Sequence, residues 1–221
     1  MGQTKLRSTQ INNNGWIDAE ETWTYASATT ITVPSGAASK YSVGDKFKLT
    51  ANSVVLYGYI RTVADTLLTV CGNPLTNHVF SATYYSKEAT PLGFPHWFSY
   101  TPTVTALTVG NGTWATSKFI INGRKGDIIL RFVYGSTSSW SGAATFSILT
   151  PFTVATGVGY AAFLDSGFGY FPAMCFFGSS RLDIYVLNCS STYGLGNIQN
   201  WDVPFEWVAG DVIEAHITFE I

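Results

Sequence analysis

The chain has 221 residues and a formal net charge of −2, and 46% of its residues are hydrophobic. Charged residues make up 12% of the chain, against roughly 25% in an average soluble protein. No basic cluster suited to neutralising phosphates occurs, so we expect no nucleic-acid partner. No apolar run reaches the roughly 18 residues that span a bilayer, and no hydrophobic signal core follows Met1. We therefore expect a protein made in the cytoplasm, without membrane insertion.

The composition predicts an all-β fold. Threonine, serine, glycine and aromatic residues dominate the chain, and 15% of its residues are aromatic. Such residues suit pleated strands and tight turns. The length leaves room for two domains, each with its own core.

Residues 1–14 are predicted to be an N-terminal arm. They are polar, end in three consecutive asparagines and show no periodic apolar pattern. Such a segment stays disordered by itself or becomes ordered on a partner.

Residues 15–87 are predicted to form a small β-barrel, SH3-like or another meander, which anchors or spaces the protein. About five strand candidates occur, around Trp23 and Tyr25, around Ile31 and Val33, and at residues 46–50, 54–63 and 67–70. Phe47 and Leu49 alternate with Lys46 and Lys48, which predicts a strand with one face in the core and the lysines in water.

Residues 88–102 are predicted to be a neck between two β domains. Three prolines and a glycine interrupt the strand pattern here, which disfavours a helix or a central strand. The aromatic side chains would be costly to leave in water on a free linker. We expect them to contact a domain or another subunit; they are Phe94, Trp97, Phe98 and Tyr100.

Residues 103–221 are predicted to form a β-sandwich, with a jelly-roll-like arrangement as first choice. About eight strands fit. Residues 103–109 and 113–121 are expected to pair through a tight turn at Asn111-Gly112. In the last strand Ile213, Ala215, Ile217, Phe219 and Ile221 alternate with polar residues and should face the core.

Three loops of this region combine serine and glycine with aromatic residues. Aromatic rings on loops of small residues are typical of recognition surfaces, although the same rings could instead cover the core or a subunit contact. The candidate ligand-contacting residues are Trp140, Phe168, Tyr170 and Tyr193.

No catalytic, cofactor-binding or metal-binding residues are predicted. The carboxylates near the C-terminus, Asp202, Glu206, Asp211 and Glu214, are interpreted as parts of solvated turns and strand ends, and no nucleophile motif accompanies the three histidines. There is no phosphate-binding glycine loop and no pair of residues at metal-ligand spacing. The chain is therefore not expected to be an enzyme.

Several stretches resemble small structural proteins of tailed bacteriophages and prophages, namely tail-fibre, minor tail or receptor-binding proteins. They are Gly15-Trp-Ile-Asp-Ala-Glu-Glu-Thr-Trp-Thr-Tyr-Ala-Ser27, Lys40-Tyr-Ser-Val-Gly-Asp-Lys-Phe-Lys-Leu-Thr50, Gly93-Phe-Pro-His-Trp-Phe98 and Pro204-Phe-Glu-Trp-Val-Ala-Gly-Asp-Val-Ile213. The pattern departs from the family at Asp18, where a proline is usual, and in the short arm.

The resemblance implies a component of the virion, on the tail or the capsid surface, and commonly a homotrimer. Its N-terminal arm and first domain would contact other virion proteins, and its sandwich would be displayed for attachment to the host surface, with a cell-surface glycan as a possible ligand. A capsid-decorating or head-fibre protein is an alternative. A polysaccharide-degrading tail enzyme and a free carbohydrate-binding module are further alternatives from other classes.

Overall fold

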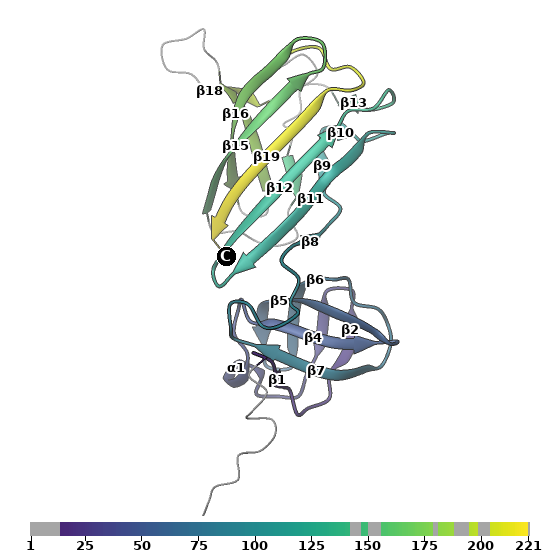
Figure 1. Cartoon of the computed structure of the whole chain (residues 1–221), viewed down its shortest axis with the longest axis vertical. Coiled ribbons are helices and arrows are strands. Elements are labelled where there is room, and N and C mark those ends of the chain that lie inside the picture. The colour runs from purple at the N-terminus through teal and green to yellow at the C-terminus, as the bar shows by residue number, and fades with distance from the viewer. Residues whose placement is uncertain are drawn as a thin grey trace, which may run out of the picture. The chain divides into compact units, whose positions relative to one another are not determined.

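The computed structural model describes residues 14–141, 147–149, 156–178, 181–187, 195–198 and 204–220. It confirms the all-β prediction, and the single short helix among these residues is α1 (Ala37–Lys40). The chain divides into two compact units, Met1–His96 and Trp97–Ile221, which we call unit 1 and unit 2 (Figure 1). Nothing helical in the described ranges has the length and apolar character that crossing a membrane requires. Of the predicted arm, only Asn14 lies inside the described residues.

Unit 1 is a curled antiparallel sheet around one apolar core (Figure 1). Large side chains such as Trp23, Phe47 and Ile60 fill this core and are almost completely buried. In spatial order the described strands are β1 (Ile17–Asp18), β7 (Phe80–Ser86), β4 (Lys46–Ala51), β5 (Val54–Ala64), β6 (Leu67–Gly72), β3 (Thr30–Thr32) and β2 (Thr24–Ser27).

The lysine face of β4 is not the wet surface that its alternation predicts. Lys46 is only 3% exposed, because the ring of its partner on β5, Tyr59, and that of Phe94 lie over it. Its Nζ lies 5.6 Å from the ring centre of Tyr59 and 5.8 Å from that of Phe94. Lys48 Nζ lies 4.7 Å from the ring centre of Trp16. These are cation–π distances, so the β4 lysines belong to an aromatic layer on the second face of the sheet.

Unit 2 is built on one ten-stranded antiparallel sheet with the sandwich-like architecture predicted for the region (Figure 1). Its described strands, in spatial order, are β8 (Phe98–Ser99), β11 (Thr113–Asn122), β12 (Lys125–Val133), β19 (Val212–Glu220), β15 (Thr156–Asp165), β16 (Gly169–Gly178), β17 (Arg181–Leu187), β14 (Ser147–Leu149) and β9 (Thr103–Thr105), with β18 (Leu195–Ile198) also paired to β17. A separate two-stranded sheet joins β10 (Leu107–Thr108) and β13 (Ser139–Trp140).

The last strand, β19, occupies the middle of this sheet and confirms its predicted faces. It pairs with β12 on one side and β15 on the other. Ile213, Ala215, Ile217 and Phe219 are buried, while Glu220 is exposed. Ile221 lies outside the described residues. An apolar side chain at every second position therefore supplies a continuous inner face.

The predicted hairpin around Asn111-Gly112 is wrong. Residues 103–109 form two short strands, β9 and β10, which pair with β14 and β13, whereas β11 pairs with β12 and β8. The Asn111 side chain is engaged elsewhere, since its Oδ1 accepts a hydrogen bond from Thr137 N at 2.9 Å and its Nδ2 donates to Ser136 Oγ at 3.0 Å. Ala106, with φ of +62°, separates the two short strands. Asn111 thus fixes a loop–loop contact.

Candidate functional site

A chain of aromatic side chains runs from the core of unit 2 to its surface at the turn between β15 and β16. Phe168, on that turn, is 84% exposed. Its ring stacks on Phe171 with centres 6.2 Å apart, Phe171 contacts Phe205 at 5.2 Å, and Phe205 contacts Trp207 at 4.7 Å. Trp207 is buried and meets the core ring of Phe163 at 5.7 Å. The exposed ring therefore rests on side chains that are anchored in the core. We call these five residues the aromatic chain.

A buried carboxylate holds the backbone around the aromatic chain. Asp211 is fully buried, and its two oxygens accept hydrogen bonds from Ser166 N at 3.0 Å and from Val208 N at 2.7 Å. The first bond fixes the turn that carries Phe168, and the second fixes the loop that carries Trp207. Asp211 does lie at a strand end, directly before β19, but the expectation that it is solvated is wrong. A charged acceptor strengthens both bonds, so the aromatic chain has a rigid support.

The charge of Asp211 also acts on Tyr134, which lies close to it. The pKa of the Tyr134 hydroxyl is raised, first by burial and second by the negative charge of Asp211. The backbone joins the same two residues, because Tyr134 N donates to Asp211 O at 2.8 Å. Tyr134 therefore stays neutral at physiological pH and acts as an aromatic wall beside the aromatic chain.

The predicted ligand-contacting residues fall into three positions. Phe168 ends the aromatic chain at the surface. Trp140 is half-buried. Its ring contacts Tyr134 and also Trp207, with ring centres 5.4 Å apart in the second case, so it packs against the buried end of the aromatic chain. Tyr170 is exposed on β16 beside the turn, opposite Leu164. Tyr193 lies outside the described residues.

The aromatic residues of the predicted neck divide between the two units. Phe94 belongs to unit 1, where its ring lies 5.1 Å from Tyr59. In unit 2, Phe98 stacks on Phe119 at 5.7 Å, and Tyr100 meets the same ring edge-on at 5.9 Å. Trp97 is half-buried beneath the ammonium of Lys118, at 5.1 Å. Each side chain contacts its own unit, and a role in subunit contacts stays a prediction.

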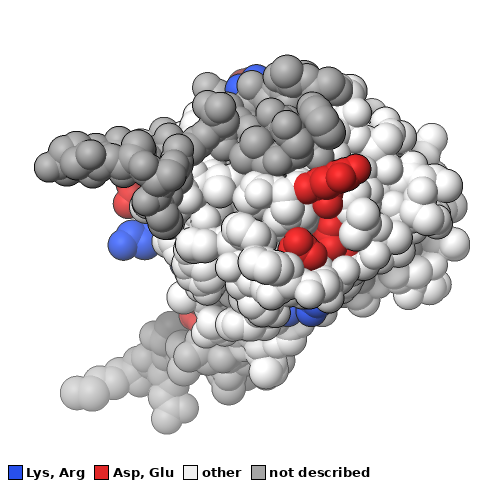
Figure 2. Space-filling model, turned by 90° about the horizontal axis from the view of Figure 1, so that it is seen from above, with Lys and Arg blue, Asp and Glu red and all other residues white. Residues whose placement is uncertain are grey.

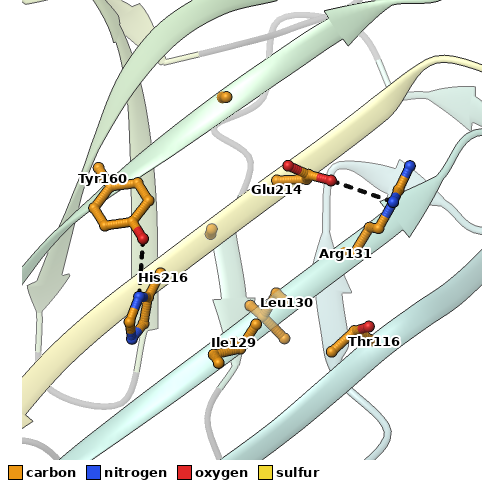
Figure 3. A pocket seen from close by; sticks show the side chains of 9 residues that line it. Thr116, Ile129, Leu130, Arg131, Tyr160, Glu214 and His216 are labelled. Atoms are coloured by element: carbon orange, nitrogen blue, oxygen red, sulfur yellow. Dashed lines mark hydrogen bonds and ion pairs between the residues drawn. The ribbon is translucent and has the colours of Figure 1, made fainter.

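A shallow pocket of about 350 Å³ lies on the outer face of the unit 2 sheet, across β11, β12, β19 and β15. Figure 3 shows the Tyr160 hydroxyl pointing to His216, and these groups share a hydrogen bond of 3.0 Å to the Nδ1 atom. On the other side of the pocket Arg131 Nε lies 3.3 Å from Glu214 Oε1 (Figure 3). His216 Nε2 faces Asp127 Oδ1 at 3.7 Å. The charged side chains and the tyrosine hydroxyl of the pocket thus have partners within the chain.

Charged side chains are unevenly spread over unit 2. On the face that Figure 2 shows, acidic atoms gather near the middle, and most of the other side chains in view are uncharged. Within the described ranges, no three or more histidine, cysteine, aspartate or glutamate side chains gather in a way that could hold a metal ion. The aromatic chain itself offers apolar stacking. Carboxylates lie beside it, since Asp165 begins the turn that carries Phe168 and the exposed Glu206 stands between Phe205 and Trp207.

Comparison with protein-family models, with curated protein sequences and with solved structures finds no match for this chain.

Sequence reasoning missed most of the aromatic chain. Phe168 was found because a ring on a glycine-rich loop signals exposure, but Phe171, Phe205 and Trp207 join it only through the fold. The available signal was the alternation of Phe205 and Trp207 just before Gly210, whose φ of +102° marks the turn into β19.

Proposed function

We propose that the chain is a structural component of a bacteriophage virion, a homotrimeric tail or fibre appendage whose unit 2 attaches to the host surface. The observation that carries the proposal is the exposed Phe168 at the end of a rigid aromatic chain. A ring held in place by its neighbours loses little entropy on binding, which is what recognition surfaces use.

The ligand that suits this site is a cell-surface glycan. The face of an aromatic ring carries negative charge density and attracts the weakly positive C–H groups on one face of a sugar ring. Asp165 and Glu206 beside the aromatic chain offer carboxylates that accept hydrogen bonds from sugar hydroxyls and disfavour anionic ligands. Unit 1, with its own core, would then serve the contacts to other virion proteins, together with residues 1–14.

The attachment role can be tested with labelled full-length chain on intact host cells. We expect Phe168→Ser to reduce cell binding at least tenfold, since ring stacking is lost while the fold is kept. A matched control is Val79→Ser, because Val79 is similarly exposed but lies in unit 1. Equal binding by the two variants would contradict attachment through the aromatic chain.

The place in the particle is tested separately, by immunogold labelling of purified virions with antibodies to the chain. We expect label on the tail. Label over the head instead would favour the capsid-decorating or head-fibre alternative, and unlabelled particles would contradict a virion component.

We expect no release of oligosaccharide from host envelope polysaccharide; release that stops on replacement of one acidic residue would favour the polysaccharide-degrading alternative.

A further inference from the structure

The outer face of β15 and β16, together with Tyr185 of β17, is apolar, although the inner face of the same strands already forms the core of unit 2. Ala161, Phe163, Ala173, Cys175 and Ile184 point inward and are buried. The residues between them point outward and remain exposed or half-exposed. We call the large apolar side chains among them the outer apolar face: Val158, Tyr160, Tyr170, Met174, Phe176 and Tyr185. Arg181 and Asp183 of β17 point to the same side of the sheet.

The strand register makes this face continuous. Tyr160 lies opposite Met174, and Met174 lies opposite Tyr185 on the next strand. Val158 lies opposite Phe176, whose ring meets Tyr185 at 5.4 Å. Residues directly opposite one another on a sheet are in side-chain contact, so the apolar surface runs across β15 and β16 to Tyr185 of β17. Asp183, which lies opposite Phe176, marks its end on β17.

The neighbouring strands show what a wet face of the same sheet looks like. On β12 and β19 the outward residues include the pairs Arg131–Glu214 and Asp127–His216. An antiparallel sheet with one solvated side has polar residues on that side, and strands that are apolar on both sides occur where both sides are covered. By this rule β12 and β19 face water, as do Arg181 and Asp183 of β17, whereas β15 and β16 are built to be covered.

The size of the face fits a subunit contact. Tyr160 is 65% and Val158 is 55% exposed. With roughly 150–250 Å² for a whole aromatic side chain, the exposed parts of the six residues together reach a few hundred Å². This matches the largest patch on a typical monomer, about 300–600 Å², and would form the apolar centre of a standard contact of about 800 Å² per partner.

The charges at the border of the face favour a copy of the same chain over a strongly charged partner. Arg181 lies 3.6 Å from Asp183 on β17, and Arg131 is paired with Glu214 on the other side. Because each charge has an opposite charge within the same chain, two copies can approach without like-charge repulsion. A highly acidic or basic partner would find no complementary field here.

We infer that the outer apolar face of β15, β16 and β17 is buried by a second copy of this chain. The inference rests on the proposed function, which it deepens by assigning the subunit contact of the appendage to this face. In a threefold arrangement the face of each copy would meet its neighbours, and the polar half on β12 and β19 would stay in water.

The test is sedimentation velocity of the full chain at micromolar concentration. We expect the wild type to sediment as a trimer, with a mass three times the 24.0 kDa of one chain. Val158→Lys and Tyr160→Lys place an ammonium in the contact and should raise the dissociation constant at least tenfold, since an unpaired buried charge costs more than the about 1.4 kcal/mol that tenfold represents. Val54→Lys is the matched control, because Val54 is 56% exposed on a strand of unit 1. It should sediment as the wild type does.

The outcomes separate the inference from the proposed function. A monomeric wild type, or folded Val158→Lys chains that still associate, would overturn the assigned contact; circular dichroism and thermal melting establish that the variants are folded. Val158→Thr, which keeps strand propensity, covers the case in which the lysine variants do not fold, and should weaken association by a smaller factor. If association depends on this face but virions carry no label, the subunit contact stands and the virion role fails. If virions are labelled but the protein is monomeric, the virion role stands and the subunit contact fails.

Discussion

Replacing Asp211 by asparagine tests whether one buried carboxylate supports the recognition end of unit 2. Asparagine keeps an oxygen for one of the two backbone donors, Ser166 N or Val208 N, and presents an amide N–H to the other. A hydrogen bond to a charged group contributes about 1.5–3 kcal/mol, so the loss of one bond and of the charge in the other amounts to about 3 kcal/mol. Asparagine also removes the cost of burying a charge, and we expect a net destabilisation of about 2 kcal/mol.

For unit 2 a loss of this size lowers the melting temperature by roughly 5–10 °C. Urea unfolding followed by tryptophan emission measures it, because Trp207 lies on the loop that Asp211 fixes. Asp165→Asn is the control, since Asp165 Oδ1 accepts one bond, from Gly167 N at 3.1 Å, in an exposed place, and should change stability by less than about 0.5 kcal/mol. Equal midpoints for the two variants would refute the supporting role of Asp211.

Three further predictions concern the cores and the charges. Burial lowers the pKa of Lys46, so Lys46→Met should raise the stability of unit 1 by about 1 kcal/mol in thermal melts; a loss would mean that the rings of Tyr59 and Phe94 stabilise the ammonium more than burial disfavours it. A Cβ on Gly126 would lie 2.2 Å from the Phe219 ring, so Gly126→Ala should cost about 1–3 kcal/mol in urea unfolding, whereas Gly178→Ala, with open space around it, should be near neutral. Burial raises the pKa of Glu21, but hydrogen bonds from Tyr41, Lys40 and Trp23 outweigh it and leave the pKa below the ordinary value of 4.5. Its contribution to stability is thus complete above that pH and is lost as the pH falls through the folded-state pKa, and Glu21→Gln should flatten the acid limb of a stability–pH curve.

The strands of unit 2 were predictable wherever strict alternation coincided with burial. The apolar positions of β19 are two residues apart, and this spacing alone identifies both the strand and its inner face. The hairpin predicted for residues 103–121 is wrong for a physical reason. Asn111-Gly112 has the composition of a tight turn, but the Asn111 side chain forms hydrogen bonds with the loop at Ser136 and Thr137. A local signal cannot show that a side chain is used by a distant loop.

In unit 1 the period of two was right, but the environment assigned to it was wrong. Lys46 and Lys48 do lie on the face opposite Phe47 and Leu49, yet Phe94 and Trp16 return over that face. β7 was missed as a strand because it is irregular, with Ala82 at φ of +49° and a register shift in its pairing with β4. Tertiary contacts decide whether the second face of a strand is wet, and a single sequence does not contain them.

The β15–β16 hairpin combines the two surfaces to which function is assigned. Its turn carries Phe168, and its strands carry most of the outer apolar face, including Val158 and Tyr160. If copies associate through the strands, several aromatic ends are presented together, and a contact that is weak for one ring gains avidity from the others. The two surfaces then separate by mutation: Phe168→Ser should leave the oligomer intact and lose cell binding, whereas Val158→Lys should keep the aromatic chain folded and lose cell binding through loss of the oligomer. Full cell binding by a monomeric Val158→Lys chain would show that attachment does not depend on assembly.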